Sequence, residues 1–257
     1  MIRARNGWGP VVALSAGLAL GGLSGCGLVG KRDSKTLGPD APESAGDVYV
    51  ALAGEYYARG QMEVAQQRAN QALNEDSNNP KAHMISALIY QRLGETAKAE
   101  EAFKRAVELA PKDGDIRNAA GTFYCAQKRF PEAEEQFKDA LAIPLYSTPW
   151  VALTNAGICA KGAGDSAKAK AYLRQAVAAN PNFGPAVLES VGLELAQGDG
   201  RSASALLAQY FKTSPPTPQA LALGIRVERE LGNKKAAASY ATMLKQRYPN
   251  SPEAQSL

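Results

Sequence analysis

Few side chains in this sequence are of the types that do chemistry in proteins. The chain of 257 residues contains one histidine, His83, and three cysteines. A metal site built from histidines needs several of them, and acid–base catalysis by histidine needs a partner group beside it. No G-x-S-x-G, H-E-x-x-H, C-x-x-C or kinase signature is present. We therefore predict no catalytic residue, no metal and no cofactor, and a protein that is not an enzyme.

Two pairs of acidic residues also have a structural explanation. Glu100-Glu101 and Glu134-Glu135 each have lysine or arginine three or four residues away. Opposite charges at this spacing lie on one face of a helix and pair there in solvent. These acids are therefore expected to form solvated helix faces.

Composition excludes several further classes of protein. Apolar residues make up 45% of the chain and charged residues 21%, as in folded globular proteins and unlike disordered ones. The formal net charge of +4 is mild, whereas nucleic-acid-binding proteins concentrate positive charge more strongly. We expect neither a nucleic-acid partner nor a small-molecule substrate.

The first residues of the chain read as a targeting segment. Arg3 and Arg5 precede an apolar stretch, Val11–Leu20, and no acidic residue occurs before Asp33. A short positive head and a short apolar run are typical of a secretory signal peptide, here predicted over residues 1–25.

The end of this segment resembles the lipobox of bacterial lipoproteins, in which the cysteine is acylated and becomes the mature N-terminus. The relevant residues are Leu23-Ser24-Gly25-Cys26. Cys26 is therefore the predicted lipidation site, and an ordinary cleaved signal with a chance cysteine is the alternative. Gly27, in place of aspartate, favours sorting to the outer membrane by the same resemblance. Residues 31–45 lack an apolar period, and residues 26–45 are predicted to be an acylated tether.

A repeat of about 34 residues organises the remainder of the chain. Successive members of one alanine column are separated by 34, 34, 36, 34 and 34 residues: Ala65, Ala99, Ala133, Ala169, Ala203 and Ala237. Glycine recurs before the alanines at Gly60, Gly94, Gly164, Gly198 and Gly232, with Lys128 in its place in the third unit. Glycine ends a first helix and proline stops a second, so each unit is predicted to be a helix pair.

This pattern is the signature of the tetratricopeptide repeat. We predict an all-α solenoid of six helix–turn–helix units over residues 46–251, forming a right-handed superhelix whose first helices line a concave face. A generic helical bundle with coincidental alanines is the alternative. The units are expected at 46–79, 80–113, 114–147, 150–183, 184–217 and 218–251, followed by a C-terminal tail at 252–257.

The repeat phase also indicates which side chains face inward. In the first unit these are Val50, Gly54 and Tyr57, and in the second Met84, Leu88 and Gln91. An apolar groove with polar edges suits an extended peptide or a short helix from a protein partner. Residual packing between repeats is the alternative role for these six residues.

Two cysteines fall in the first helices of adjacent units. Cys125 and Cys159 are 34 residues apart, and first helices of neighbouring repeats lie side by side. Disulfides form in the oxidising compartments that secreted proteins reach. We predict a disulfide between them, and two small buried side chains are the alternative.

With these features together, the chain resembles the type IV pilus biogenesis lipoproteins, the PilF/PilW pilotins. The more specific stretches of the resemblance are Asn118–Cys125, Asn155–Cys159, Leu223–Arg226 and Ala238–Pro249.

The resemblance implies a lipid-anchored protein on the periplasmic face of the outer membrane that binds secretin subunits and promotes their localisation or multimer assembly. Two other functions stay open from the residues. One is a scaffold lipoprotein for outer-membrane protein assembly, and the other is an adaptor for peptidoglycan enzymes.

Overall fold

The computed structural model describes residues 44–257. The expected signal peptide, the lipidation site Cys26 and most of the expected tether lie outside these residues. Those expectations stay predictions.

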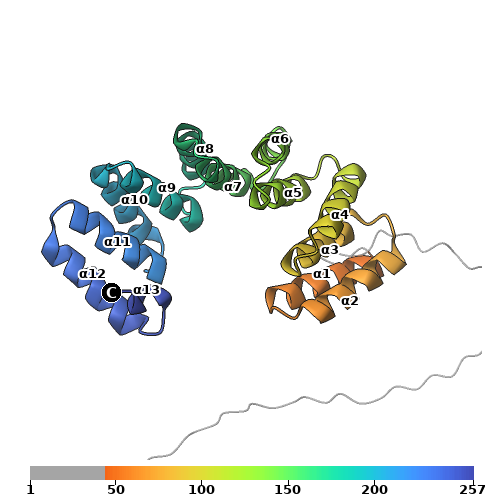
Figure 1. Ribbon diagram of the computed structural model, residues 1–257, viewed down its shortest axis with the longest axis horizontal. Coiled ribbons are helices and arrows are strands. Elements are labelled where there is room, and N and C mark those ends of the chain that lie inside the picture. The colour runs from red at the N-terminus through yellow and green to blue at the C-terminus, as the bar shows by residue number, and fades with distance from the viewer. Residues whose placement is uncertain (1–43) are drawn as a thin grey trace, which may run out of the picture. The chain divides into compact units, whose positions relative to one another are not determined.

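Twelve helices of 12 to 14 residues follow one another in the described part, and a short thirteenth closes it. Each of the first twelve pairs with its neighbour in the chain to form a helix–turn–helix unit (Figure 1). Their bounds are α1 Ala45–Ala58, α2 Met62–Glu75, α3 Pro80–Arg92, α4 Thr96–Leu109, α5 Gly114–Ala126, α6 Phe130–Leu141, α7 Pro149–Gly162, α8 Ser166–Ala179, α9 Gly184–Ala196, α10 Gly200–Thr213, α11 Pro218–Glu230, α12 Lys234–Arg247 and α13 Pro252–Gln255.

The turn within each unit depends on one residue in the left-handed backbone conformation. Gly60 has φ +76°, and its N–H and that of Gln61 donate to carbonyls of the last turn of α1 at 3.0 and 2.9 Å. These bonds satisfy carbonyl groups that the helix leaves unpaired. In the third unit Lys128 takes this conformation with φ +60°, which costs a residue with a Cβ about 1 kcal/mol.

Small side chains allow the paired helices to approach closely. The alanine column found in the sequence is buried throughout: Ala65, Ala99, Ala133, Ala169 and Ala203 are fully buried and Ala237 is 5% exposed. Larger side chains complete the packing within and between units. The largest fully buried ones, Phe103, Phe123 and Phe137, form part of one core cluster in the second to fourth units.

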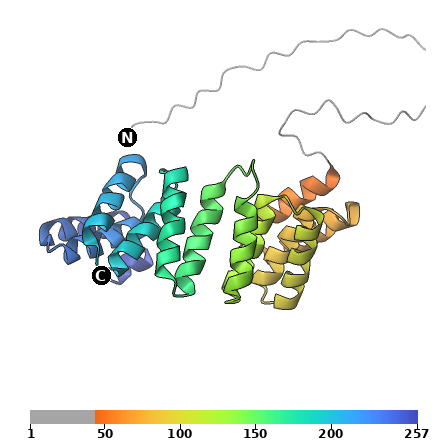
Figure 2. The same cartoon turned by 90° about the horizontal axis from the view of Figure 1, so that it is seen from above.

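The two helices of each unit lie on different sides of the stack. The backbone of each odd-numbered helix from α1 to α11 packs beside that of the next odd-numbered helix. In the described part the backbones of the even-numbered helices stand farther apart, and side chains such as Lys168 of α8 and Glu134 of α6 bridge the space between them. The odd-numbered helices therefore form the inner side, which we call the inner face, and the even-numbered helices form the outer side (Figure 1). Figure 2 shows the units side by side in chain order.

The all-α tetratricopeptide architecture expected from the sequence is confirmed. Helices α1 and α7 begin one residue before the units assigned to them, and residues 252–257, expected as a tail, contain the short helix α13. Within residues 44–257, no helix combines the length and the apolar character that crossing a membrane requires.

Close packing at one helical glycine gives a direct test of this architecture. A Cβ added to Gly157 in α7 would lie 2.7 Å from Cγ of Leu173 and 3.3 Å from the carbonyl oxygen of Ala169 in α8. We expect Gly157→Ala to lower the free energy of unfolding by about 1–3 kcal/mol, because overpacking outweighs the helix propensity that alanine gains. Urea unfolding followed by circular dichroism measures the change.

Gly192 in α9 is the matched control. A Cβ there would meet no atom within 4 Å. Gly192→Ala should therefore raise stability, by up to about 1 kcal/mol, since only the propensity gain remains. Equal effects of the two substitutions would contradict the packing argument.

Candidate functional site

The inner face is a surface that runs along all six units and carries side chains exposed to solvent. One row along it steps from helix to helix with the repeat: Gly54, Leu88, Thr122, Ile158, Gly192 and Arg226. All six residues are partly or fully exposed. Each odd-numbered helix from α1 to α11 contributes one residue to this row. Because these helices lie side by side, the row runs continuously along the stack.

The first two units give this face an apolar character. Val50 and Tyr57 on α1 and Leu88 on α3 are half-buried and pack against the same buried cluster, which contains Ala53 and Ile89. The structure thus brings together side chains that the sequence predicted to face inward.

The remaining predicted residues border the same patch. Met84 packs on the neighbouring core cluster, and Gln91 is half-buried one turn beyond Leu88. A Cβ at Gly54 would meet no atom within 4 Å, so the surface has open space above this glycine. The guanidinium of Arg92 stands 5.5 Å from the ring centre of Tyr57 and gives the patch a charged edge.

The third and fourth units are joined covalently beside this face. Cys125 on α5 and Cys159 on α7 form a disulfide, with their Cα atoms 5.7 Å apart. Nearby, the Asn155 side-chain amide donates to Oδ1 of Asn118 at 3.0 Å, which ties the same two helices. The disulfide fixes the spacing of α5 and α7 in the middle of the inner face.

In the last units the inner face carries exposed arginines, whereas in the first two units it is apolar. A cavity of about 270 Å³ there is lined by residues of α7, α9, α11 and α13, among them Gly192, Ala222 and Arg226. Arg226 and Arg229 on α11 are exposed, and Ile158 on α7 is 39% exposed. The sequence prediction stopped at the second unit, although the repeat step, 34 residues throughout except for 36 into the fourth unit, leads to these positions.

Charged groups elsewhere are held in their ionised forms by ion pairs. Hydrogen bonds from Arg129 and then Lys104 lower the pKa of Glu100, and those from Lys168 and then Lys138 lower the pKa of Glu134. A general acid needs the opposite shift at neutral pH. Glu100 and Glu134 therefore form ion pairs with lysine and arginine on the helix surface, as the sequence predicted.

The other polar residues that the sequence singled out have local roles. His83 lies 2.9 Å from the carbonyl oxygen of Ser77 through Nε2, at the turn before α3. Among residues 44–257, no group of three or more histidine, cysteine, aspartate or glutamate side chains is placed to hold a metal ion.

Helix pairs in a 34-residue period, small buried columns and a free inner face define a tetratricopeptide-repeat protein, a class of scaffold for protein–protein interaction. Tetratricopeptide-repeat profiles match residues 50–114, 86–146, 160–224 and 222–251.

Relatives narrow the class. The type IV pilus assembly protein PilF of Pseudomonas aeruginosa is 30% identical over 176 residues, which are 68% of this chain and 67% of PilF. An uncharacterised protein of Haemophilus influenzae is 34% identical over 121 residues, covering 47% of this chain and 68% of that protein.

Solved structures agree with the sequence relatives. The crystal structure of PilW, described as a widely conserved type IV pilus biogenesis factor, has a TM-score of 0.73 at 32% identity and covers 83% of this chain and 98% of PilW. The structure of Pseudomonas aeruginosa PilF has a TM-score of 0.69 at 28% identity and covers 82% and 96%. The chain belongs to the type IV pilus biogenesis family of tetratricopeptide-repeat proteins that includes PilF.

The disulfide is expected to stabilise the folded protein, and this can be tested. Replacing both Cys125 and Cys159 by alanine should lower the free energy of unfolding by about 3–4 kcal/mol, because the bond closes a loop of 34 residues in the unfolded chain. Chemical denaturation with and without reductant measures this. The wild-type protein in reductant should match the double variant, and a midpoint that ignores reductant would show that the bond adds no stability.

Proposed function

We propose that this protein is a lipid-anchored pilotin on the periplasmic face of the outer membrane, which binds secretin subunits and promotes their localisation or multimer assembly without catalysing a reaction. Its relatives support the setting, because PilF is named as a type IV pilus assembly protein and PilW as a pilus biogenesis factor. The observation that carries the proposal is the apolar inner face of the first two units, with open space at Gly54.

The geometry suits a polypeptide client. Half-buried Val50, Tyr57 and Leu88 offer apolar contact, and an extended segment or short helix of the secretin subunit would bury it. Arg92 and Gln91 at the edge supply polar contacts that fix the direction of the bound segment. A small number of such contacts carries most of the affinity in protein interfaces.

The expected lipid anchor explains how binding becomes assembly. Acyl chains on Cys26 would hold the protein at the membrane, where each buried methylene adds about 0.8 kcal/mol of membrane affinity. The tether then keeps the inner face within reach of the bilayer. A client bound there is confined to the surface on which its multimer forms, which raises its effective concentration.

Filling the open space at Gly54 tests the client site. Gly54→Trp should leave the fold intact, because a side chain there begins in open space, and should weaken binding of the purified secretin subunit about tenfold or more. Binding is measured by calorimetry, and heat-stable secretin multimers are measured in cells that carry the variant.

Ala97→Trp is the matched control, since Ala97 is an exposed residue on the outer helix α4. It should bind the secretin subunit as the wild type does. Undiminished binding by Gly54→Trp would exclude the inner face of the first units as the client site.

Replacing the lipidation site tests the anchor separately. Cys26→Ala should preserve helix content and thermal stability but remove the protein from the outer-membrane fraction, because the acylated residue is gone. Ser34→Ala in the expected tether is the control and should fractionate normally. Retention of Cys26→Ala in the outer membrane would refute lipidation at this residue.

A further inference from the structure

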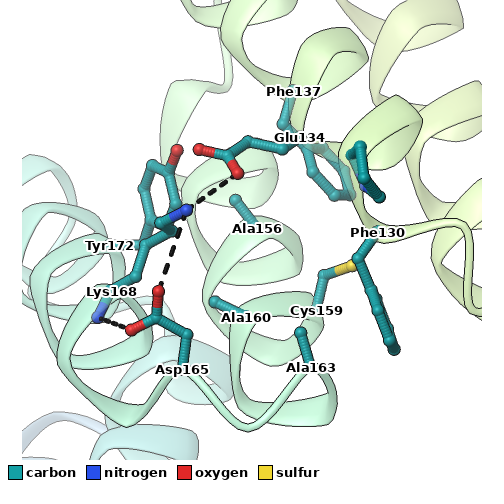
Figure 3. A pocket seen from close by; sticks show the side chains of 11 residues that line it. Phe130, Glu134, Phe137, Ala156, Cys159, Ala160, Ala163, Asp165, Lys168 and Tyr172 are labelled. Atoms are coloured by element: carbon teal, nitrogen blue, oxygen red, sulfur yellow. Dashed lines mark hydrogen bonds and ion pairs between the residues drawn. The ribbon is translucent and has the colours of Figure 1, made fainter.

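A groove on the outer side of the stack lies between the third and fourth units. It contains a cavity of about 330 Å³ between α6 and α8, with α7 as its floor (Figure 3). The floor consists of small residues, Ala156, Ala160 and Ala163, together with Cys159. Phe130, Phe137 and Tyr172 supply aromatic surface around it, and Glu134, Asp165 and Lys168 lie at its polar edge.

Comparison of the repeats shows that this groove lacks a tyrosine that the earlier units have. One column holds tyrosine in the first three units, at Tyr56, Tyr90 and Tyr124, and the fourth unit has Ala160 at the same place. Tyr124 fills the equivalent junction between the second and third units, where it is 8% exposed and packs edge-on against Phe123. At the next junction the smaller Ala160 leaves space where a ring would stand.

A cation accompanies the ring in each unit that has one. Arg59 stands over Tyr56 at 6.0 Å, Lys98 over Tyr90 at 5.4 Å and Arg129 over Tyr124 at 4.5 Å from the ring centre. A cation over an aromatic face is attracted by the electron density of the ring.

The fourth unit retains the cation without the ring. Lys168 occupies the repeat position of Lys98, and its Nζ contacts Glu134 at 2.8 Å across the groove. Glu134 in turn occupies the repeat position of Glu100, which pairs with Arg129 at 2.9 Å beside Tyr124. The groove thus combines an apolar floor, aromatic walls and an ammonium group, and it shares with the sites of the three tyrosines a cation placed to face an aromatic ring.

We propose that this groove is a second docking site, which binds an aromatic side chain of a partner polypeptide beneath Lys168. It lies on the opposite side of the stack from the inner face and does not depend on the proposed secretin site. The other tyrosine junctions supply the template, since the guest ring takes the place that Tyr124 takes one unit earlier. The shared chemistry selects an aromatic guest over an aliphatic one, because only the aromatic ring interacts with the ammonium group.

The experiment uses the full chain and two small probes. N-acetyl-tyrosinamide and N-acetyl-leucinamide are titrated in ligand-observed NMR, which measures their dissociation constants. We expect the tyrosine probe to bind more tightly than the leucine probe. Ala160→Tyr should weaken binding of the tyrosine probe about tenfold or more by filling the cavity, and Lys168→Met should weaken it about threefold or more.

Ala205→Tyr adds the same side chain at an exposed position of α10 and should leave probe binding unchanged. If Ala160→Tyr does not fold, Ala160→Leu fills part of the cavity and serves in the same comparison. Gly54→Trp should not affect the probes, so the secretin proposal and this one stand or fall separately. Equal binding of the two probes, or undiminished binding of the tyrosine probe by the variants that fill the cavity, would overturn the proposal.

Discussion

Close approach of helices at small side chains is the contact on which the rest of this structure depends. Gly121 and Gly157 leave room for Phe137 and Leu173 of the paired helices, and the buried alanines do the same in each unit. Each unit buries its apolar side only against its neighbours, so the stack has no central core that all residues share. Because each unit buries apolar side chains only where it meets its neighbours, one long surface on each side of the stack remains exposed and available for partners.

The arrangement of helices could be read almost completely from the sequence, because local rules produce it. A glycine in the left-handed conformation ends the first helix of five units, at φ between +76° and +84°. Lys128 at φ +60° takes this place in the third unit, so the turn does not require glycine. The short helix α13 was not predicted. It contacts α11 and α12 at the end of the stack, where no further repeat sets a period.

The candidate site was predictable only in part. The repeat phase predicted the inward residues of the first two units. The open space at Gly54 and Gly192 depends on which atoms of the folded stack come near each glycine, which no single unit encodes. Cys125 and Cys159 differ by two in repeat position because of the inserted residues before α7, yet they are spatial neighbours. Residues of neighbouring units can therefore be in contact even when they do not occupy the same position in the aligned repeats.

The outer groove shows why a change in one column of a repeat becomes a cavity and does not close. Loss of a large side chain leaves a void when the surrounding structure cannot relax into it. Here α6 is held against α5 and α8 against α7, and the disulfide ties α5 to α7. Neither wall can move toward Ala160 without breaking the packing of its own unit. The rigidity that small residues give each helix pair therefore preserves the space that a missing tyrosine opens between two pairs.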